Sequence, residues 1–125
     1  MMLVASGRQD RDRGPAYDYF DMDYRRLDMR RGHPNSHQPP EMPAAFEEMK
    51  RLAVALSRGL PHARVDFYQA DGRVYFGEIT FYPAGGSEPF DPPECDARIG
   101  GWLDLGPVKR KNGRSRTDDG GRSGV

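Results

Sequence analysis

Two carboxylates, an arginine and a hydroxyl stand in two short apolar stretches of this 125-residue chain. Arg64 and Asp66 lie in ARVDFY, and Glu78 and Thr80 lie in RVYFGEITFY. Both stretches have the β-branched and aromatic composition of strands. Because an ionised side chain is costly to bury without a partner, these charges call for an ion pair or a metal ion. Two carboxylates and a hydroxyl suit Mg²⁺, which takes oxygen ligands from one or two carboxylates and from substrate phosphates.

The same residues have an ordinary structural interpretation. Arg64 and Glu78 could form a cross-strand ion pair while Asp66 faces water, an arrangement worth little free energy at a surface. In the chemical interpretation, the arginine would instead stabilise charge on a transferred phosphoryl group. The spacing of the residues leaves both interpretations open.

The turn between the two stretches decides whether these side chains share a face. Asp71-Gly72 signals the reversal of a β-hairpin. A two-residue turn would place Asp66 and Glu78 on opposite faces, whereas a three-residue loop would place Arg64 opposite Glu78, with Asp66 beside them. The three-residue loop also gathers the apolar and small residues on the other face: Ala63, Val65, Phe67, Tyr75, Gly77, Ile79 and Phe81. We therefore predict the three-residue loop, with the four polar side chains on one face.

The rest of the chain predicts one small domain over residues 17–106. Residues 43–58 read as a helix because apolar side chains recur there at helical spacing. Residues 17–28 are an edge strand or an irregular segment, and prolines make residues 32–43 a loop. The acidic residues of the first segment could contact a substrate, but we expect them to form an exposed acidic edge: Asp18, Asp21 and Asp23. Residues 1–16 and 107–125 hold few residues to bury and are expected to be disordered. The expected fold is α+β: an antiparallel sheet with a central hairpin, and one or two packed helices.

The composition excludes several classes of protein. The chain has 19 basic and 19 acidic residues, so its net charge gives no electrostatic basis for binding nucleic acid or a membrane surface. A single cysteine, Cys95, excludes an intramolecular disulfide and a multi-cysteine metal site. No apolar stretch approaches the roughly 20 residues of a membrane helix, and MMLVA is too short for a signal peptide. The chain is therefore expected to be soluble and cytoplasmic.

Several segments together resemble a known family. The order R-x-D, E-x-T and a glycine loop in ARVDFYQADGRVYFGEITFYPAGG is similar to the closing hairpin of the ATP-grasp fold. In addition, YFDMDYRRLD, FEEMKRLAVALSRGLPHARVDFY, FGEITFYPAGG and FDPPECDARIGGWLDLG occur in the order seen in the TupA-like ATP-grasp family, named after a teichuronopeptide-biosynthesis protein. The resemblance covers residues 17–106 and implies the C-terminal portion of an ATP-grasp fold.

The resemblance implies a role for three residues of the hairpin. Asp66 matches the first acidic metal ligand, and Glu78 matches the bridging acidic ligand that holds Mg²⁺ against the ATP phosphates. Arg64 matches the arginine that stabilises the phosphoryl group during transfer.

Three further positions are placed by the same resemblance. Thr80 stands where the general ATP-grasp pattern has asparagine, so its hydroxyl would be a weaker metal ligand. Gly85 and Gly86 match the loop whose backbone approaches the acyl phosphate, and the lack of side chains allows that close approach.

The family resemblance also implies an activity. ATP-grasp enzymes use ATP to convert a carboxylate into an acyl phosphate, which an amine then attacks. This family is often labelled as polysaccharide-biosynthesis or glycosyltransferase-related, which implies a carboxylate or amine substrate belonging to a cell-surface polymer precursor. The upstream nucleotide-gripping domains are not matched, so we expect a partial enzyme, with weak or no ATP turnover alone, that a separate N-terminal half would complete. The alternative is a non-catalytic domain that keeps the fold as a binding or partner module.

Overall fold

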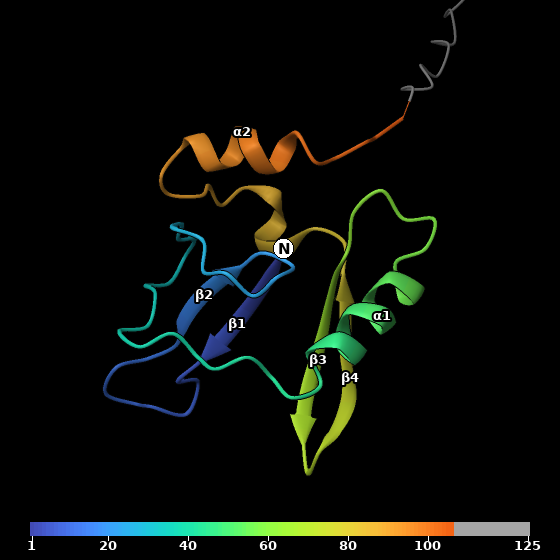
Figure 1. Cartoon of the computed structure of the whole chain (residues 1–125). Coiled ribbons are helices and arrows are strands. Elements are labelled where there is room, and N and C mark those ends of the chain that lie inside the picture. Colours follow the sequence, from blue (N-terminus) through green and yellow to red (C-terminus); the bar gives the residue numbers. More distant parts are fainter. Residues whose placement is uncertain (107–125) are drawn as a thin grey trace, which may run out of the picture.

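The computed structural model describes residues 1–106 as an α+β arrangement, which confirms the predicted fold class. Its antiparallel strands form two separate two-stranded sheets, β1–β2 and β3–β4, rather than one sheet (Figure 1). The predicted disorder of residues 107–125 lies outside the described residues. The elements, in chain order, are β1 (Met2–Ser6), β2 (Ala16–Phe20), α1 (Phe46–Leu56), β3 (Arg64–Ala70), β4 (Arg73–Thr80), a 3-10 turn (Pro83–Gly86) and α2 (Glu94–Gly100).

The N-terminal segment is not disordered throughout, so this part of the prediction for residues 1–16 is wrong. β1 pairs antiparallel with β2, from Met2 opposite Phe20 to Ser6 opposite Ala16. The charged residues that suggested disorder lie in the loop between these strands. The short apolar run before them gains backbone hydrogen bonds from β2 and places Leu3 against the core.

The core lies between the β1–β2 pair and α2, away from the β3–β4 hairpin. Tyr19, Met29 and Cys95 are its buried members. The residues packed around them are Leu3, Tyr17, Leu27, Phe90 and Ile99. Because the core is this small, we expect the free energy of unfolding to depend strongly on the few side chains that are fully buried.

The predicted helix is present and slightly shorter than expected, with α1 at Phe46–Leu56 instead of 43–58. Phe46 is buried, and the Ala45 amide just before the helix donates to Oε1 of Gln69 in β3 (3.1 Å). Gln69 shares a strand face with Val65 and Phe67 by alternation. α1 therefore contacts the face of β3 opposite to Arg64 and Asp66, and it lies beside the hairpin in Figure 1.

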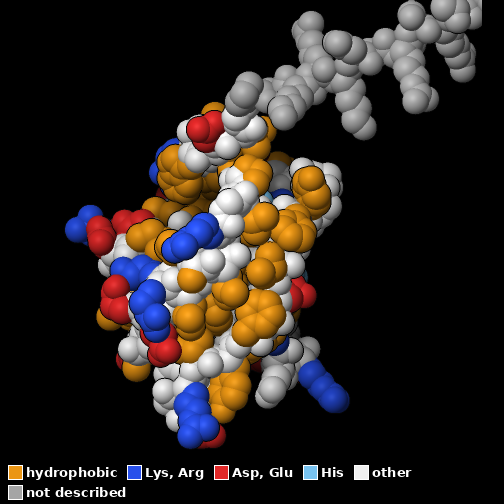
Figure 2. All heavy atoms as spheres, turned by 90° about the vertical axis from the view of Figure 1, so that its right-hand side faces the viewer, with side chains coloured by type: hydrophobic (Ala, Val, Ile, Leu, Met, Phe, Trp, Pro, Cys, Tyr) orange, Lys and Arg blue, Asp and Glu red, His pale blue; other side chains and the backbone are white. Residues whose placement is uncertain are grey.

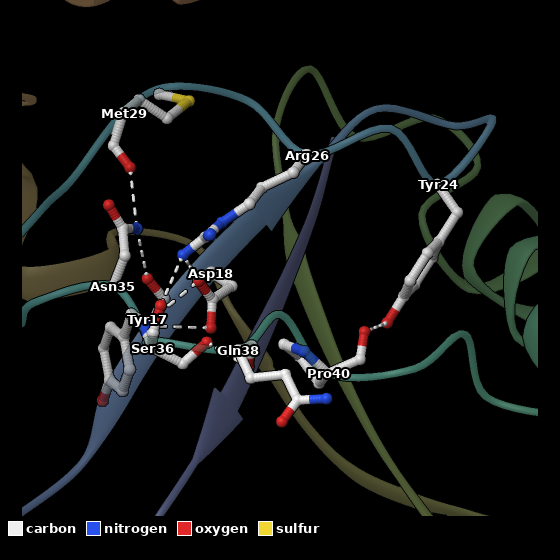
Figure 3. Close-up of polar contacts among 9 residues, drawn as sticks. All are labelled: Tyr17, Asp18, Tyr24, Arg26, Met29, Asn35, Ser36, Gln38 and Pro40. Atoms are coloured by element: carbon white, nitrogen blue, oxygen red, sulfur yellow. Dashed lines mark hydrogen bonds and ion pairs between the residues drawn. The ribbon is translucent and has the colours of Figure 1, made fainter.

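Asp18 is fully buried, although the sequence favours an exposed acidic edge for this residue. Its Oδ1 accepts a hydrogen bond from Nη2 of Arg26 (2.6 Å) and lies 3.3 Å from the Ser36 amide (Figure 3). The same Arg26 nitrogen donates to the Ser36 carbonyl (2.8 Å). Asn35 adds bonds from its amide nitrogen to the Tyr17 carbonyl (2.8 Å) and the Met29 carbonyl (3.0 Å). These contacts fix the proline-rich loop against β2.

Asp21 gives a pH-dependent prediction. The backbone amide of Arg25 is the main reason that the Asp21 pKa is lowered, and the amide of Asp23 adds to it. A lowered pKa in the folded state stabilises the protein above the unfolded value of about 4, and this contribution disappears as the pH falls through the folded-state pKa. We expect Asp21→Asn to lower the free energy of unfolding at pH 6 but not at pH 2.5. Urea titrations of both proteins at each pH measure this difference, and an equal difference at both values would contradict the prediction.

The β3–β4 hairpin exposes much apolar surface. Hydrophobic side chains gather on the face of the molecule at the right of Figure 1, as Figure 2 shows. The exposed large apolar residues of the hairpin and the segment after it are Tyr68, Tyr75, Phe76, Phe81 and Tyr82. Among the described residues, no helix has the length and apolarity needed to cross a membrane.

Candidate functional site

The hairpin reverses through a two-residue turn, so the predicted three-residue loop is wrong. Ala70 pairs with Arg73, and both residues between them have positive φ, 50° at Asp71 and 71° at Gly72. Asp-Gly is a preferred sequence for such a turn, in which both central residues are left-handed. The turn length inferred from the pattern of apolar residues was therefore incorrect.

A β-bulge nevertheless brings the predicted polar residues together. Phe67 pairs with Phe76 but Val65 pairs with Ile79, so Gly77 and Glu78 of β4 stand opposite the single residue Asp66. An extra residue in one strand restores the side-chain alternation that the shorter turn would have reversed. The bulge thus places Glu78 on the face of Arg64 and Asp66.

Arg64 is the centre of the cluster. Its Nε donates to Oδ1 of Asp66 (2.8 Å), and its Nη2 donates to Oδ2 of Asp66 (3.0 Å) and to Oε1 of Glu78 (2.9 Å). The hydroxyl of Thr80 also donates to Oε1 of Glu78 (2.9 Å) and lies 3.3 Å from Nη2 of Arg64. The structure therefore brings together all four of the residues predicted on the hairpin, and one guanidinium joins both carboxylates.

The cluster is half-buried rather than enclosed. The side chains of Arg64, Asp66 and Glu78 are 36%, 26% and 61% exposed. Partial burial alone would lower the pKa of Arg64, but hydrogen bonds and charge from Asp66 and Glu78 outweigh it, and the pKa is raised. Arg64 is thus a permanent cation held by two carboxylates that a ligand can reach from solvent.

The donor set fits Mg²⁺ only with help from a ligand. Within the described part of the chain, no three histidine, cysteine or acidic side chains group into a metal site. Two carboxylates and a hydroxyl leave most of an octahedral shell to water and to phosphate oxygens, as is usual for Mg²⁺ sites that act on nucleotides. Asp66, Glu78 and Thr80 are the residues that would hold the ion.

The predicted glycine loop follows the same hairpin. Ala84, Gly85 and Gly86 all have positive φ, at 52°, 63° and 73°. Alanine in this conformation costs about 1–2 kcal/mol relative to the right-handed region. A methyl group added at Gly85 or Gly86 would meet no atom within 4 Å, so the glycines leave that side of the loop open.

Sequence analysis missed two features of this region. One is the bulge at Gly77, which the glycine between Phe76 and Glu78 could have indicated because glycine inside a strand often marks a bulge. The other is Arg31, whose side chain contacts the segment that carries the glycine loop. Arg31 is 33 residues before Arg64 in the chain, and no local pattern connects the two regions.

Gly77→Ala tests the bulge. The added methyl group would lie 2.7 Å from Cε2 of Tyr68 and 3.0 Å from the carbonyl oxygen of Asp66. The tyrosine ring can move, but the backbone oxygen cannot move without shifting Asp66. We expect the free energy of unfolding to fall by about 1 kcal/mol, at the low end for overpacking. Chemical denaturation measures the loss. Gly72→Ala is the control, because Gly72 has positive φ but open space around it, so its substitution reports backbone strain without a steric contact. An unchanged stability for Gly77→Ala would contradict the bulge geometry.

A comparison with protein families identifies the chain. The family model described as TupA-like ATPgrasp matches residues 9–103, which include both strands of the hairpin and the glycine loop. The match begins before residue 17, where the sequence resemblance was expected to start, and so includes much of the β1–β2 loop. No curated protein and no solved structure gives a match to the chain. Because the family model covers most of the sequence, the chain belongs to the TupA-like ATP-grasp family.

Proposed function

We propose that the polar face of the β3–β4 hairpin binds Mg²⁺ together with the phosphates of ATP, as part of an ATP-dependent carboxylate–amine ligase. The observation that carries this proposal is Arg64 held between Asp66 and Glu78 on a half-exposed strand face, with Thr80 beside them. β4, the strand that carries Glu78 and Thr80, is followed directly by the glycine loop. An enzyme of this kind needs ATP and so would work in the cytoplasm.

The ion pairs explain how the free protein keeps these residues in place. Without ligand, the guanidinium of Arg64 offsets the repulsion between the two carboxylates. With a nucleotide bound, Arg64 would donate to its phosphates, and Asp66 and Glu78 would hold Mg²⁺ through their carboxylate oxygens. Each charged group then exchanges one partner for another, so the site need not expose an unpaired charge at any stage.

The proposed reaction joins a carboxylate to an amine. First, the γ-phosphoryl group of ATP is transferred to an oxygen of the carboxylate, which gives an acyl phosphate and ADP. The amine then attacks the acyl carbon, phosphate leaves, and an amide forms with loss of a proton from the amine. Mg²⁺ would neutralise phosphate charge. Arg64 would stabilise the negative charge that spreads over the phosphoryl oxygens during transfer. The backbone of the loop at Gly85 and Gly86, which no side chain covers there, would approach the acyl phosphate. The substrates would belong to a cell-surface polymer or its precursor.

Calorimetry tests the binding step without requiring turnover. A non-hydrolysable ATP analogue is titrated into the pure chain with and without Mg²⁺, and into the Asp66→Asn variant. We expect Mg²⁺-dependent binding by the wild type and its loss in Asp66→Asn. Asp71→Asn is a matched control, because this aspartate stands in the exposed hairpin turn. Equal binding by wild type and Asp66→Asn would overturn the proposed site.

A non-catalytic binding module is the second candidate. The observation in its favour is that Arg64 already satisfies both carboxylates, which makes the cluster stable without any ligand. For a module of this kind, a folded chain would show no Mg²⁺-dependent binding of the analogue. The same titration therefore decides between the two functions.

A further inference from the structure

The side chain of Arg31 joins the two ends of the glycine loop. Its Nε donates to the carbonyl of Glu88 (2.8 Å), and its Nη2 donates to the carbonyl of Pro83 (3.1 Å). These carbonyls stand on either side of residues 84–87. One planar guanidinium therefore sets the distance between the points where the loop leaves and rejoins the body of the protein.

The position of Arg31 is fixed by its surroundings. The side chain is only 16% exposed, its guanidinium carbon lies 4.9 Å from the ring centroid of Phe90, and the Glu88 carboxylate is 3.7 Å from Nε. The neighbouring backbone is also tied down, because Arg30 and Asp91 exchange two backbone hydrogen bonds of 2.7 and 2.9 Å. Because Arg31 is itself held in place, its hydrogen bonds can restrict the motion of the loop.

The loop is a 3-10 turn with further hydrogen bonds at its two ends. The Gly85 amide donates to the Tyr82 carbonyl (3.0 Å), and both the amide and the hydroxyl of Ser87 donate to the Ala84 carbonyl (3.3 Å each). Three left-handed residues in succession, one of them alanine, are unfavourable unless the surroundings impose them. The contacts that Arg31 makes at both ends are the strongest candidates for that constraint.

We infer that Arg31 is a positioning residue that holds the glycine loop in its ligand-binding conformation. The inference rests on the proposed function for the ligand, whereas the effect on the loop does not depend on it. The loop begins at Pro83, shortly after the strand that carries Glu78 and Thr80, so its conformation matters for a ligand bound at the polar cluster.

Backbone NMR relaxation on the whole chain tests the effect on the loop. In the wild type we expect order parameters near 0.85 at Gly85 and Gly86, and in Arg31→Gln values below about 0.6. Arg30→Gln is the matched control, because its ion pair with Asp91 is exposed and its backbone bonds to Asp91 remain. A merely structural role would loosen β3 and β4 to the same extent as the loop. Rigid glycines in Arg31→Gln, or uniform loosening of the whole chain, would overturn the inference.

Binding of the ATP analogue with Mg²⁺ tests the consequence for the ligand. We expect Arg31→Gln to raise the Kd about tenfold, in the range for partners that orient a binding group. Arg31→Lys keeps the charge beside Glu88 but cannot donate to two carbonyls in one plane, so it should not restore the affinity. An unchanged Kd in Arg31→Gln, despite a mobile loop, would overturn the positioning role. A wild type that fails to bind the analogue would instead refute the proposed function, and the relaxation measurement would still decide whether Arg31 holds the loop.

Discussion

Glu78→Gln is expected to weaken Mg²⁺-dependent binding of an ATP analogue by about 100-fold. Loss of a residue that only supports a metal ligand already lowers metal affinity by up to about 100-fold, and Glu78 is proposed to be a ligand itself. The substitution keeps the shape of the side chain and its hydrogen bond from Thr80, but it removes the charge that would attract the ion. Nucleotide binding without Mg²⁺ should change little, because Glu78 is proposed to contact the phosphates only through the ion. Calorimetry with and without Mg²⁺ separates these effects.

The controls for Glu78→Gln concern folding and general charge. Glu78 is 61% exposed, so losing its pair with Arg64 should lower the free energy of unfolding by less than about 1 kcal/mol. Glu94→Gln makes the same chemical change at an exposed residue in the first turn of α2. We expect this control to bind like the wild type. An affinity reduced equally in both variants would show a nonspecific charge effect and contradict a metal-binding role for Glu78.

Asp18→Ala is expected to lower the free energy of unfolding by about 3 kcal/mol, the low end for removing one partner of a buried ion pair. The aspartate is fully buried, while the side chain of Arg26 is 32% exposed and can regain some water. The Ser36 amide also loses its acceptor, which removes one of the contacts that fix the proline-rich loop against β2. For a small domain such a loss is a large fraction of the total stability.

Urea denaturation measures the effect of Asp18→Ala, with Asp23→Ala as its control. Asp23 forms a long, exposed ion pair with Arg25 (3.9 Å), and its removal should cost less than about 0.5 kcal/mol. Replacing both members of the buried pair, as in Asp18→Leu with Arg26→Met, should recover part of the lost stability because no charge is then left unpaired. A cost below about 1 kcal/mol for Asp18→Ala would show that the pair contributes little.

The sequence was sufficient to find the hairpin and its polar cluster, because both depend on short-range patterns. Alternating polar and apolar residues identified β3 and β4, and Asp71-Gly72 located the turn between them. The turn length was predicted wrongly, yet the same side chains meet, because the bulge at Gly77 adds the residue that the turn lacks. The order of residue types alone cannot distinguish a two-residue turn with a bulge from a three-residue loop without one, because both bring the same side chains together.

The features that the sequence did not reveal depend on contacts between distant segments. β1 was mistaken for disorder because its pairing with β2 crosses a charged loop. Asp18 was interpreted as exposed because the ion pair with Arg26 and the loop over it are formed only by folding. Arg31 gave no signal for a similar reason, since the carbonyls it contacts lie more than 50 residues further along the chain.

Paramagnetic broadening by Mn²⁺ locates the proposed metal site most directly. Mn²⁺ takes the same oxygen ligands as Mg²⁺, and added at low concentration with the ATP analogue it should broaden the backbone NMR signals of residues 64–66 and 78–80 first. Excess Mg²⁺ should restore these signals, and Glu78→Gln should prevent the broadening. Signals that broaden first at other acidic residues, or a hairpin that stays sharp while the nucleotide is bound, would contradict a metal site formed by Asp66 and Glu78.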